Sequence, residues 1–332
     1  MKNLTVCPCT LQPGFDTYSP SALKVLFDGT KVSPTLDIDF ETADGNANMV
    51  ENKHNLSISG SQEKYSAVVD NGFIRLSQPD EQATFILKPA PLLNISTRKQ
   101  IPANEHLTMQ IASQIYGIPT AANALCFSSK AQPVYITRRF DVKPDKTKYA
   151  MEDFASILGI SEQGRDSNFK YDGYYAMIAD AIRKIVPAWM LETERFFKLV
   201  LFNYLYANED AHLKNFSLIN RNGEYSLAPA YDLINTRLHL ESSDLGLKGG
   251  LAPDIEPSEA MLRTGHLCHI DFKRFGQRIG LPEKRIEKVL DLYMDFPSEV
   301  YALIDRSFLN DKMKRNYKHT IEQRRQWYVR NE

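Results

Sequence analysis

The chain lacks the long apolar runs and the cysteine pairs that would place it in a membrane or in an oxidising compartment. No stretch of its 332 residues reaches the roughly 18 consecutive apolar residues of a transmembrane helix, and Met1–Thr10 has no signal-peptide core. Only four cysteines are present, which is too few for a disulfide scaffold in a chain of this length. We therefore expect a cytoplasmic protein that makes no membrane contact.

The chain also lacks an excess of charge of either sign. Forty Lys and Arg stand against 41 Asp and Glu, which gives a formal net charge of −1. This balance argues against extensive nucleic-acid binding and leaves room only for a local basic patch. The short clusters at Cys7–Cys9 and His266–His269 lack the paired C-x-x-C units of a zinc site, so we expect no structural zinc.

What is present is the composition of an ordinary globular protein, 43% hydrophobic and 24% charged, in a chain long enough for two lobes. Residues 1–50 carry many turn formers, so we expect a loop-rich segment with one short helix near Ser21–Phe27. Residues 51–145 are predicted to form an N-terminal lobe. The helix expected in this lobe is Asn104–Tyr116. The four strands expected are Tyr65–Val69, Phe73–Leu76, Thr84–Lys88 and Val134–Phe140.

Residues 146–332 show mainly helical periodicity and are predicted to form a C-terminal lobe. The turns Asp70–Gly72 and Arg221–Gly223 each predict a hairpin, the second one joining Phe216–Ile219 to Tyr225–Leu227. Apart from that hairpin we expect an all-helical C-terminal lobe, and hence an α+β, bilobal fold with a cleft between the lobes. The helices expected are Met151–Leu158, Tyr174–Val186, Leu191–Tyr206, Asp271–Ile279, Glu283–Met294 and Met313–Tyr328.

The most informative segment is the loop Asn208–Phe216, which follows a long apolar helix and precedes a hairpin. It contains Asp210 and, five positions later, Asn215; a second aspartate, Asp232, lies beyond the hairpin. Phosphoryl transfer needs a carboxylate to orient the acceptor hydroxyl and oxygen ligands to hold Mg²⁺ against the phosphates. Each residue alone is more often a structural loop residue, but the order and spacing together favour a kinase catalytic loop.

Two further elements support this interpretation. Lys88 ends an apolar strand, so its stem is expected to pack while its ammonium reaches phosphate oxygens. Glu105 on the following helix is a candidate ion-pair partner for Lys88, with capping or solvent exposure as equal alternatives. The small-residue loop Ser57–Lys64 would let backbone N–H groups approach phosphates, although it is neither a Walker A nor a G-x-G-x-x-G motif.

Taken in order, these segments resemble the signature of the HipA family of serine/threonine protein kinases. The resemblance spans roughly residues 55–310 and implies a protein-kinase-like bilobal fold that transfers the γ-phosphate of ATP, with Mg²⁺, to a protein hydroxyl. The matching segments are Gly60–Lys64, Ile86–Lys88, Arg139–Asp141, Met151–Phe154, Asp210–Asn215 and Pro229–Asp232.

The resemblance also implies a role for each matching residue. Asp210 is expected as the catalytic base, Asn215 and Asp232 as the Mg²⁺ ligands, and Lys88 as the group that holds the ATP phosphates. The other implied ATP-binding residues are Ser59, Gly60, Ser61, Gln62, Glu63 and Lys64 in the phosphate loop, Arg138, Arg139 and Phe140 at the adenine hinge, and His212, Lys214 and Tyr231.

Self-regulation is implied as well. In this family a serine just before the Gly-x-Gln-x-Lys loop is autophosphorylated, which switches the kinase off. Ser57 occupies that position, and Ser59 offers a second hydroxyl. A phosphate adds about −1.5 to −2 charges at neutral pH and would repel the phosphates of ATP. We therefore expect autoinhibition through phosphorylation of Ser57 and Ser59.

HipA kinases carry a further β-rich subdomain ahead of the matching region, which we expect this chain to lack. In this it resembles the short HipT branch of three-gene HipB–HipS–HipT toxin–antitoxin systems. That resemblance implies as partners a small HipS-like antitoxin and a helix-turn-helix, DNA-binding HipB-like antitoxin, so DNA contact would be indirect. The implied substrate is a serine of an aminoacyl-tRNA synthetase, the tryptophanyl enzyme in this branch, whose modification would inhibit translation.

Two alternatives stay open from the residues alone. A pseudokinase scaffold would bind nucleotide and partners without transfer, but the intact set of Asp210, Asn215, Asp232 and Lys88 argues against it. A small-molecule phosphotransferase would use similar loop chemistry. The loop serines favour a protein hydroxyl as acceptor, through the family resemblance.

Overall fold

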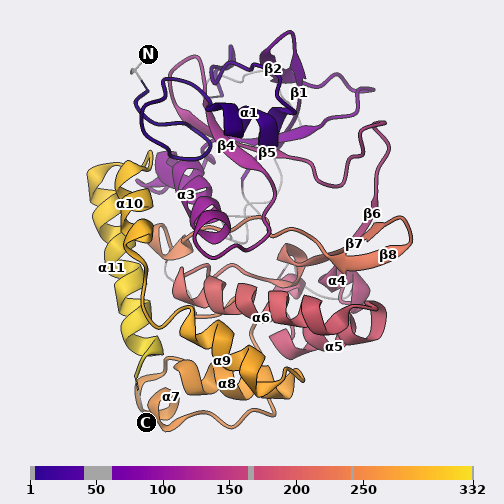
Figure 1. The fold of residues 1–332 in the computed structure, drawn as a ribbon, viewed down its shortest axis with the longest axis vertical. Helices are drawn as coiled ribbons and strands as arrows, with labels where there is room; N and C mark the ends of the chain where they lie inside the picture. Colours follow the sequence, from indigo (N-terminus) through magenta and orange to yellow (C-terminus); the bar gives the residue numbers. More distant parts are fainter. Residues whose placement is uncertain (1–3, 41–61, 164–167, 241–242, 331–332) are drawn as a thin grey trace.

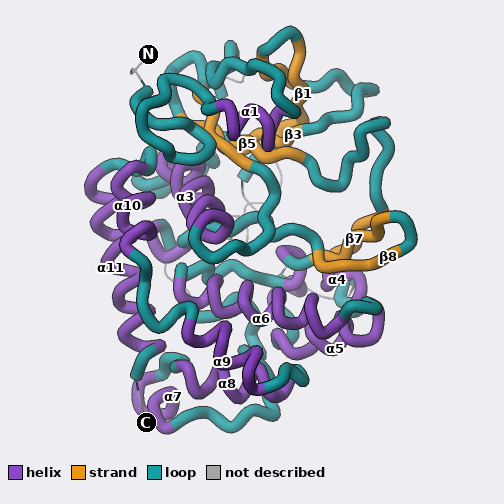
Figure 2. The backbone as a smooth tube through the Cα atoms, in the orientation of Figure 1, coloured by secondary structure: helices purple, strands orange, loops and turns teal. Residues whose placement is uncertain are grey.

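A computed structural model describes residues 4–40, 62–163, 168–240 and 243–330, which build two lobes stacked along the long axis (Figure 1). The N-terminal lobe holds a five-stranded sheet, and the C-terminal lobe holds most of the helices (Figure 2). The expected mixed, bilobal fold is therefore confirmed. Ser57, Ser59, Gly60 and Ser61 lie outside the described residues.

The N-terminal sheet is antiparallel, with the strand order β2-β1-β3-β5-β4. Asn71 and Gly72 both have positive φ, as a two-residue hairpin turn between β1 and β2 requires. One strand, β4, was not anticipated, because its residues are nearly all buried and the period-2 alternation of a half-exposed strand is missing. The strands are β1 (Tyr65–Asp70), β2 (Phe73–Leu76), β3 (Phe85–Lys88), β4 (Asn123–Phe127) and β5 (Pro133–Arg138).

The two faces of this sheet have different coverings. Residues 4–40, including the expected short helix α1 (Pro20–Phe27), pack on the face that carries Phe85 and Leu87. Ser19 caps α1 by accepting a hydrogen bond from the Ala22 N–H at 3.3 Å. Because side chains alternate along a strand, β3 turns Lys88 to the opposite face, toward the C-terminal lobe.

Helix α3 (Ile101–Gln114) packs against β4 and β5 and also contacts α10 of the other lobe. In Figure 1 the final helix, α11, forms one side of the C-terminal lobe and extends toward α3. The helices of the C-terminal lobe are α4 (Phe154–Ile157), α5 (Tyr175–Ile185), α6 (Trp189–Leu205), α7 (Glu259–Thr264), α8 (His269–Arg278), α9 (Glu283–Asp291), α10 (Ser298–Arg306) and α11 (Asp311–Tyr328). The short 3-10 helices within the described ranges are η1 (Arg98–Gln100), η2 (Phe169–Tyr171), η3 (Leu213–Asn215) and η4 (Thr236–Leu238).

The C-terminal lobe is not all-helical, which corrects one expectation. Strand β6 (Ala150–Asp153) pairs with β7 (Ser217–Arg221), which forms the anticipated hairpin with β8 (Glu224–Leu227). A helix was expected from Met151, but it begins only at Phe154, after the cap at Asp153. The residues of β6 are mostly exposed, and the strand exists because β7 offers it a ladder partner from far along the chain. Local periodicity cannot reveal such a partner.

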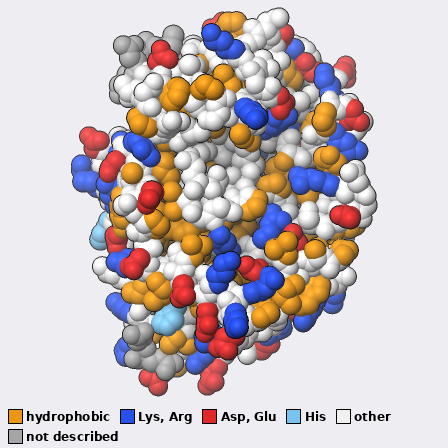
Figure 3. All heavy atoms as spheres, in the orientation of Figure 1, with side chains coloured by type: hydrophobic (Ala, Val, Ile, Leu, Met, Phe, Trp, Pro, Cys, Tyr) orange, Lys and Arg blue, Asp and Glu red, His pale blue; other side chains and the backbone are white. Residues whose placement is uncertain are grey.

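Backbone contacts tie the lobes together beside the cleft. The Ala121 N–H donates to the Ala230 carbonyl at 2.9 Å, and the Ala230 N–H donates to the Pro119 carbonyl at 2.8 Å. A large core of buried side chains continues from α3 into α5, α6 and the last helices. Acidic and basic side chains are interspersed on the face shown in Figure 3. Among the described residues no helix is long and apolar enough to cross a membrane.

Candidate active site

A cavity of about 490 Å³ lies between the lobes, within the size range of small-molecule sites. Much of its wall is made of residues singled out from the sequence. These are Lys64, Lys88, Arg138, Arg139, Phe140, His212, Lys214, Asn215, Tyr231 and Asp232. A smaller adjoining hollow is lined by Gln62, Glu105 and Asp210, among others. The fold therefore gathers most of the described candidate residues around one space.

A buried charge cluster lies at the back of this cavity. The Lys88 ammonium contacts the Glu105 carboxylate at 2.6 Å and also bonds to the Asp232 carboxylate. Burial alone would lower the pKa of Lys88, but the two carboxylates raise it above its usual value. Burial opposes ionisation of Asp232 too, yet Lys88 and Lys64 lower its pKa, so this carboxylate stays charged. Glu105 is thus the partner of Lys88, neither a cap nor a solvated residue.

Helix α3 and the segment after Asp232 are joined directly. The Asn104 amide donates to the Asn235 carbonyl at 2.8 Å, and its oxygen accepts from the Asn235 N–H at 3.3 Å. Asn104 directly precedes Glu105, and Asn235 lies three residues after Asp232. These hydrogen bonds therefore help to fix Glu105 and Asp232 relative to each other. Asp232 has φ of 56°, in the left-handed region that non-glycine residues seldom adopt. Backbone strain of this kind is concentrated at functional sites.

The oxygen groups at this end of the cavity suit a divalent cation. Asp232 supplies an ionised carboxylate, and the Asn215 amide lies beside it, with its nitrogen 3.5 Å from Asp232 Oδ2. Asn215 Oδ1 accepts the His212 N–H at 3.1 Å and keeps a second lone pair. Carboxylate and amide oxygens with substrate phosphates are a usual Mg²⁺ environment. The donor set therefore fits the metal expected from the sequence.

The catalytic loop leaves α6 and passes through η3. His212 lines the cavity and is nearly fully buried, and burial lowers its pKa to about 3, so its ring is neutral at ordinary pH. Neither ring nitrogen of His212 has a hydrogen-bond partner among the described residues. A buried, unsatisfied polar group costs free energy, and a bound ligand would relieve that cost.

Asp210 lies at the edge of this space and is only partly buried. The hydroxyl of Tyr171, on η2, donates to Asp210 Oδ1 at 2.5 Å. Lys170 lines the main cavity, and burial lowers the pKa of its ammonium. Lys170 and Tyr171 were not among the residues predicted from the sequence. Only the turn formers Asp172 and Gly173 mark this segment, and they do not indicate a functional residue.

Two aromatic rings, those of Phe140 and Tyr231, line the cavity. The Phe140 and Tyr231 ring centroids lie 6.0 Å apart. The Tyr231 hydroxyl lies 2.6 Å from Ser217 Oγ and donates to the Lys214 carbonyl at 2.9 Å, which fixes the ring. Flat apolar surfaces of this kind suit a nucleobase.

Arg138 and Arg139, the two arginines of the predicted adenine hinge, direct their side chains to carboxylates of the protein. Arg138 forms two hydrogen bonds to Asp28, at 2.7 and 2.6 Å, and Arg139 binds Asp141 at 3.0 and 2.6 Å. Their backbone N–H groups donate to the Ala122 and Thr84 carbonyls, each at 2.8 Å. Base contacts from this hinge would therefore use its carbonyls, its side-chain surfaces or Phe140.

The described part of the phosphate loop approaches the cavity through Lys64. Its ammonium lies 3.7 Å from the Asp232 carboxylate, and its side chain is 45% exposed. Gln62 is buried and donates to the Pro89 carbonyl at 3.0 Å, which anchors the loop to the end of β3. Glu63 accepts the Tyr65 hydroxyl at 2.7 Å. Lys64 is thus the loop residue placed to meet phosphate.

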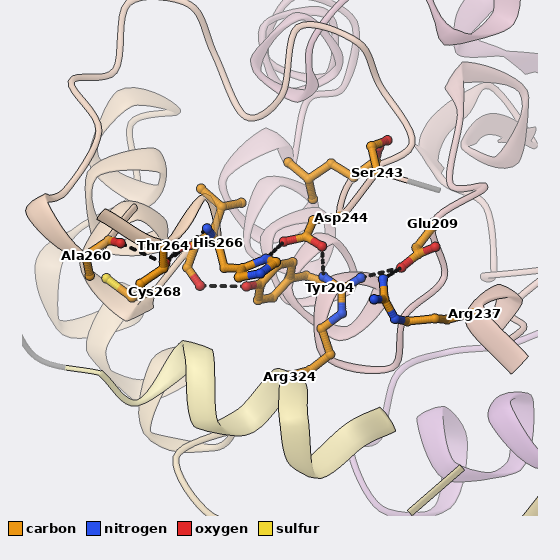
Figure 4. A network of polar contacts seen from close by, with 12 residues as sticks. Tyr204, Glu209, Arg237, Ser243, Asp244, Ala260, Thr264, His266, Cys268 and Arg324 are labelled. Carbon is orange, nitrogen blue, oxygen red and sulfur yellow. Dashed lines mark hydrogen bonds and ion pairs between the residues drawn. The ribbon is translucent and has the colours of Figure 1, made fainter. Parts of the chain in front are cut away.

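A second network of ion pairs connects the predicted catalytic loop to α11 (Figure 4). Glu209, directly before Asp210, is fully buried and contacts Arg237 at 3.0 Å and Arg324 at 2.5 Å. Arg324 comes from α11 and also pairs with Asp244 at 2.9 Å. Asp244 in turn accepts from His266 at 2.7 Å. The sequence analysis did not identify this network.

Comparison with known proteins finds a matching family model, similar sequences and a similar fold. The family model described as the HipA-like C-terminal domain matches residues 56–299. A putative kinase of Haemophilus influenzae is 25% identical over 307 residues, which is 88% of this chain and 87% of that protein. The putative kinase Y4mE of Sinorhizobium fredii is 25% identical over 69% of this chain, but the match covers only 48% of that protein.

Among solved structures, the chain is similar to HipA of Shewanella oneidensis, determined in a complex with HipB and its operator DNA. The TM-score is 0.65 with 17% identity, over 86% of this chain and 67% of that one. At this identity the likeness concerns the fold alone.

Proposed function

This chain belongs to the family of HipA-like C-terminal domains, and from that premise we propose that it is an ATP-dependent protein kinase of the toxin type. Residues 51–145 serve as the nucleotide-binding lobe, with residues 1–50 as a loop-rich segment ahead of it. Residues 146–332 serve as the catalytic lobe. The acceptor is a serine or threonine hydroxyl of another protein.

One observation carries this proposal: Asp210, Asn215, Asp232 and Lys88 all line the small hollow that adjoins the cavity between the lobes, and all but Asp210 line that cavity as well. Lys88 and Asp232 are already in contact, and the Asn215 amide nitrogen lies 3.5 Å from Asp232. A base, two oxygen ligands and a cation are the groups that phosphoryl transfer needs. A pseudokinase would need none of these groups to remain together.

In the proposed reaction, Asp210 accepts the proton of the acceptor hydroxyl. The hydroxyl oxygen bonds to the γ-phosphorus while the bond to the β–γ bridging oxygen breaks, and ADP leaves with that electron pair. Lys88 and Lys64 neutralise phosphate charge; Asp232 and Asn215 would hold Mg²⁺, which would supply further positive charge against the phosphates. Phe140 and Tyr231 contact the base, together with Arg138 and Arg139 through their hinge. His212 and Lys214 line the nucleotide side.

The finer parts of the proposal concern biology. We propose that the substrate is a serine of an aminoacyl-tRNA synthetase, the tryptophanyl enzyme in a HipT-like system, and that its modification inhibits translation. Phosphorylation of Ser57 and Ser59 switches the kinase off. The partners are a HipS-like small antitoxin and a HipB-like DNA-binding antitoxin, and the Shewanella HipA complex with HipB and DNA is in keeping with this.

Incubation of the purified chain with γ-labelled ATP and Mg²⁺ tests the activity, with tryptophanyl-tRNA synthetase and dephosphorylated casein as acceptors. Wild type should label an acceptor and itself. Asp210→Asn should abolish labelling while calorimetry still detects ATP binding. Asp145→Asn, which changes an exposed carboxylate outside the cavity, is the matched control and should label normally.

Other results would select a different function. ATP binding without any labelled protein would indicate the nucleotide-binding scaffold. Labelling of a small molecule alone, such as an aminoglycoside added as a probe, would indicate the small-molecule phosphotransferase. Equal labelling by wild type and Asp210→Asn would contradict the role of Asp210.

A further inference from the structure

The Tyr171 hydroxyl is hydrogen-bonded to one oxygen of Asp210, the carboxylate proposed as the catalytic base. It donates to Asp210 Oδ1 at 2.5 Å. A general base must lie within hydrogen-bond distance of the proton that it removes, about 2.6–3.2 Å between heavy atoms. A serine hydroxyl that delivers its proton to Asp210 would need to make the same contact. The phenol therefore reproduces the interaction that the substrate makes.

The ring of Tyr171 is fixed against the catalytic loop as well. It meets the His212 ring edge-on, with 5.2 Å between centroids, and the Lys170 ammonium lies 5.1 Å from the Tyr171 ring centroid. Tyr171 thus fills the space beside Asp210 with a bulky side chain. An incoming polypeptide has to displace that side chain to bring a smaller hydroxyl to the same carboxylate.

The segment that carries Tyr171 packs Phe169 against the core and makes polar contacts to the loop around Lys248. The Lys248 N–H donates to the Tyr171 carbonyl at 3.0 Å, and the Gly249 N–H donates to the Gly173 carbonyl at 2.8 Å. Lys248 also forms an ion pair with Asp172 at 2.7 Å, in which the two side chains are 62% and 35% exposed. An exposed pair of this kind contributes little free energy. Opening of the segment would break this ion pair, the two backbone hydrogen bonds and the hydrogen bond from Tyr171 to Asp210.

We propose that Tyr171 is a cap on the acceptor subsite, an autoinhibitory contact that a protein substrate must displace before phosphate transfer. This inference rests on the proposed kinase function and deepens it. In the capped state ATP can occupy the cavity while the acceptor cannot reach Asp210. The cap selects acceptors whose flanking residues bind strongly enough to displace the tyrosine, and it disfavours transfer to water.

The cap predicts a specific change in kinetics. If only the uncapped fraction binds the acceptor, the apparent dissociation constant equals the intrinsic one divided by that fraction. Tyr171→Phe keeps the ring but removes the hydroxyl that bonds to Asp210. We expect the KM for the protein acceptor to fall by roughly tenfold, with kcat and the KM for ATP changed by less than about twofold.

Two further variants make the test specific. Tyr225→Phe removes a hydroxyl from an exposed tyrosine on β8 and should leave all constants unchanged. Lys248→Gln weakens the attachment of the segment at the surface and should lower the acceptor KM by about two- to threefold. Tyr171→Phe combined with Lys248→Gln should gain little over Tyr171→Phe alone, because both act on one equilibrium.

The acceptors are tryptophanyl-tRNA synthetase and dephosphorylated casein, assayed by ADP release and by mass spectrometry. A lower acceptor KM in both Tyr171→Phe and Lys248→Gln supports the cap. A lower kcat in Tyr171→Phe would overturn it and make the hydroxyl a support for Asp210. An unchanged acceptor KM, or phosphate found on Tyr171 itself, would also overturn it. Absence of transfer by wild type and every variant would instead end the proposed function, and the cap with it.

Discussion

Arg324, near the end of the last helix, forms a 2.5 Å ion pair with Glu209, the residue directly before Asp210. Both side chains are essentially inaccessible to solvent. The guanidinium also lies 4.9 Å from the Tyr204 ring centroid and pairs with Asp244. One cation on α11 therefore joins the C-terminal helix to the catalytic loop.

Replacing Arg324 should be strongly destabilising. Removing one partner of a buried ion pair leaves its carboxylates in a poorly solvated place and typically costs about 3–5 kcal/mol. We expect Arg324→Ala to lose about that much free energy of unfolding in urea titrations. Arg325→Ala, at the neighbouring position, is the matched control. Asp295, a partner of Arg325, is 94% exposed, so this pair should contribute less than about 1 kcal/mol to the free energy of unfolding. Equal losses in the two variants would contradict the importance of the buried pair.

Lys88→Met should weaken ATP binding. A hydrogen bond to a charged group contributes about 1.5–3 kcal/mol, so we expect the dissociation constant for ATP to rise by roughly 10- to 100-fold. The variant also leaves Glu105 buried without its ammonium partner, which should lower the thermal stability. Calorimetric titration with ATP measures the first effect. Lys130→Met, which removes an exposed lysine paired with Asp39, should bind ATP normally.

Gly246→Ala should lower turnover through the catalytic loop. A Cβ at position 246 would lie 2.7 Å from backbone atoms of Ala211, so the loop beside Asp210 would have to move. A displacement of about 1 Å at a reacting group can reduce the rate by about 10²-fold. We expect kcat to fall by roughly 10- to 100-fold in protein that still binds ATP.

Gly276→Ala is the control for the effect of overpacking at a site away from the catalytic loop. Its Cβ would lie 2.8 Å from the Ile286 side chain, in the contact between α8 and α9. Overpacking of this kind costs about 1–3 kcal/mol of stability. We expect a lower melting temperature with kcat unchanged below it. A similar loss of kcat in both variants would mean that overpacking anywhere in the lobe reduces activity.

His106 should make the fold sensitive to acid. Burial lowers its pKa to about 4, and one ring nitrogen bonds to the Cys9 carbonyl at 2.8 Å. The ordinary histidine pKa is about 6.5, so between these values the unfolded chain takes up a proton that the native chain does not. Stability from this neutral ring is complete above about pH 6.5 and is lost as the pH falls toward 4, by about 1.4 kcal/mol per pH unit.

Urea titrations at pH 7 and pH 5 measure that slope. Between pH 7 and pH 5, the free energy of unfolding of His106→Gln should fall by about 2 kcal/mol less than that of wild type, whatever the absolute stability of the variant. His319→Gln, at an exposed position on α11, should lose as much as wild type. The same loss in wild type and His106→Gln would show that His106 does not contribute to the acid sensitivity.

Much of the fold could be predicted from the sequence. The Asn-Gly turns at residues 71–72 and 222–223 identified both hairpins, because only a few residues adopt the positive φ that such turns need. Helical periodicity located α3, α5 and α6. Strands β4 and β6 escaped prediction, since a fully buried strand and an exposed edge strand both lack alternation.

The sequence by itself determined the candidate residues: the order and spacing of Lys88, Asp210, Asn215 and Asp232 predict a phosphate-transfer site. Only the tertiary structure decided that Glu105 pairs with Lys88, that Tyr171 contacts Asp210 and that Arg324 supports Glu209. Spacing along a chain indicates which residues share one loop or one face of an element. Contacts between distant segments depend on how elements pack, and no local pattern contains that information.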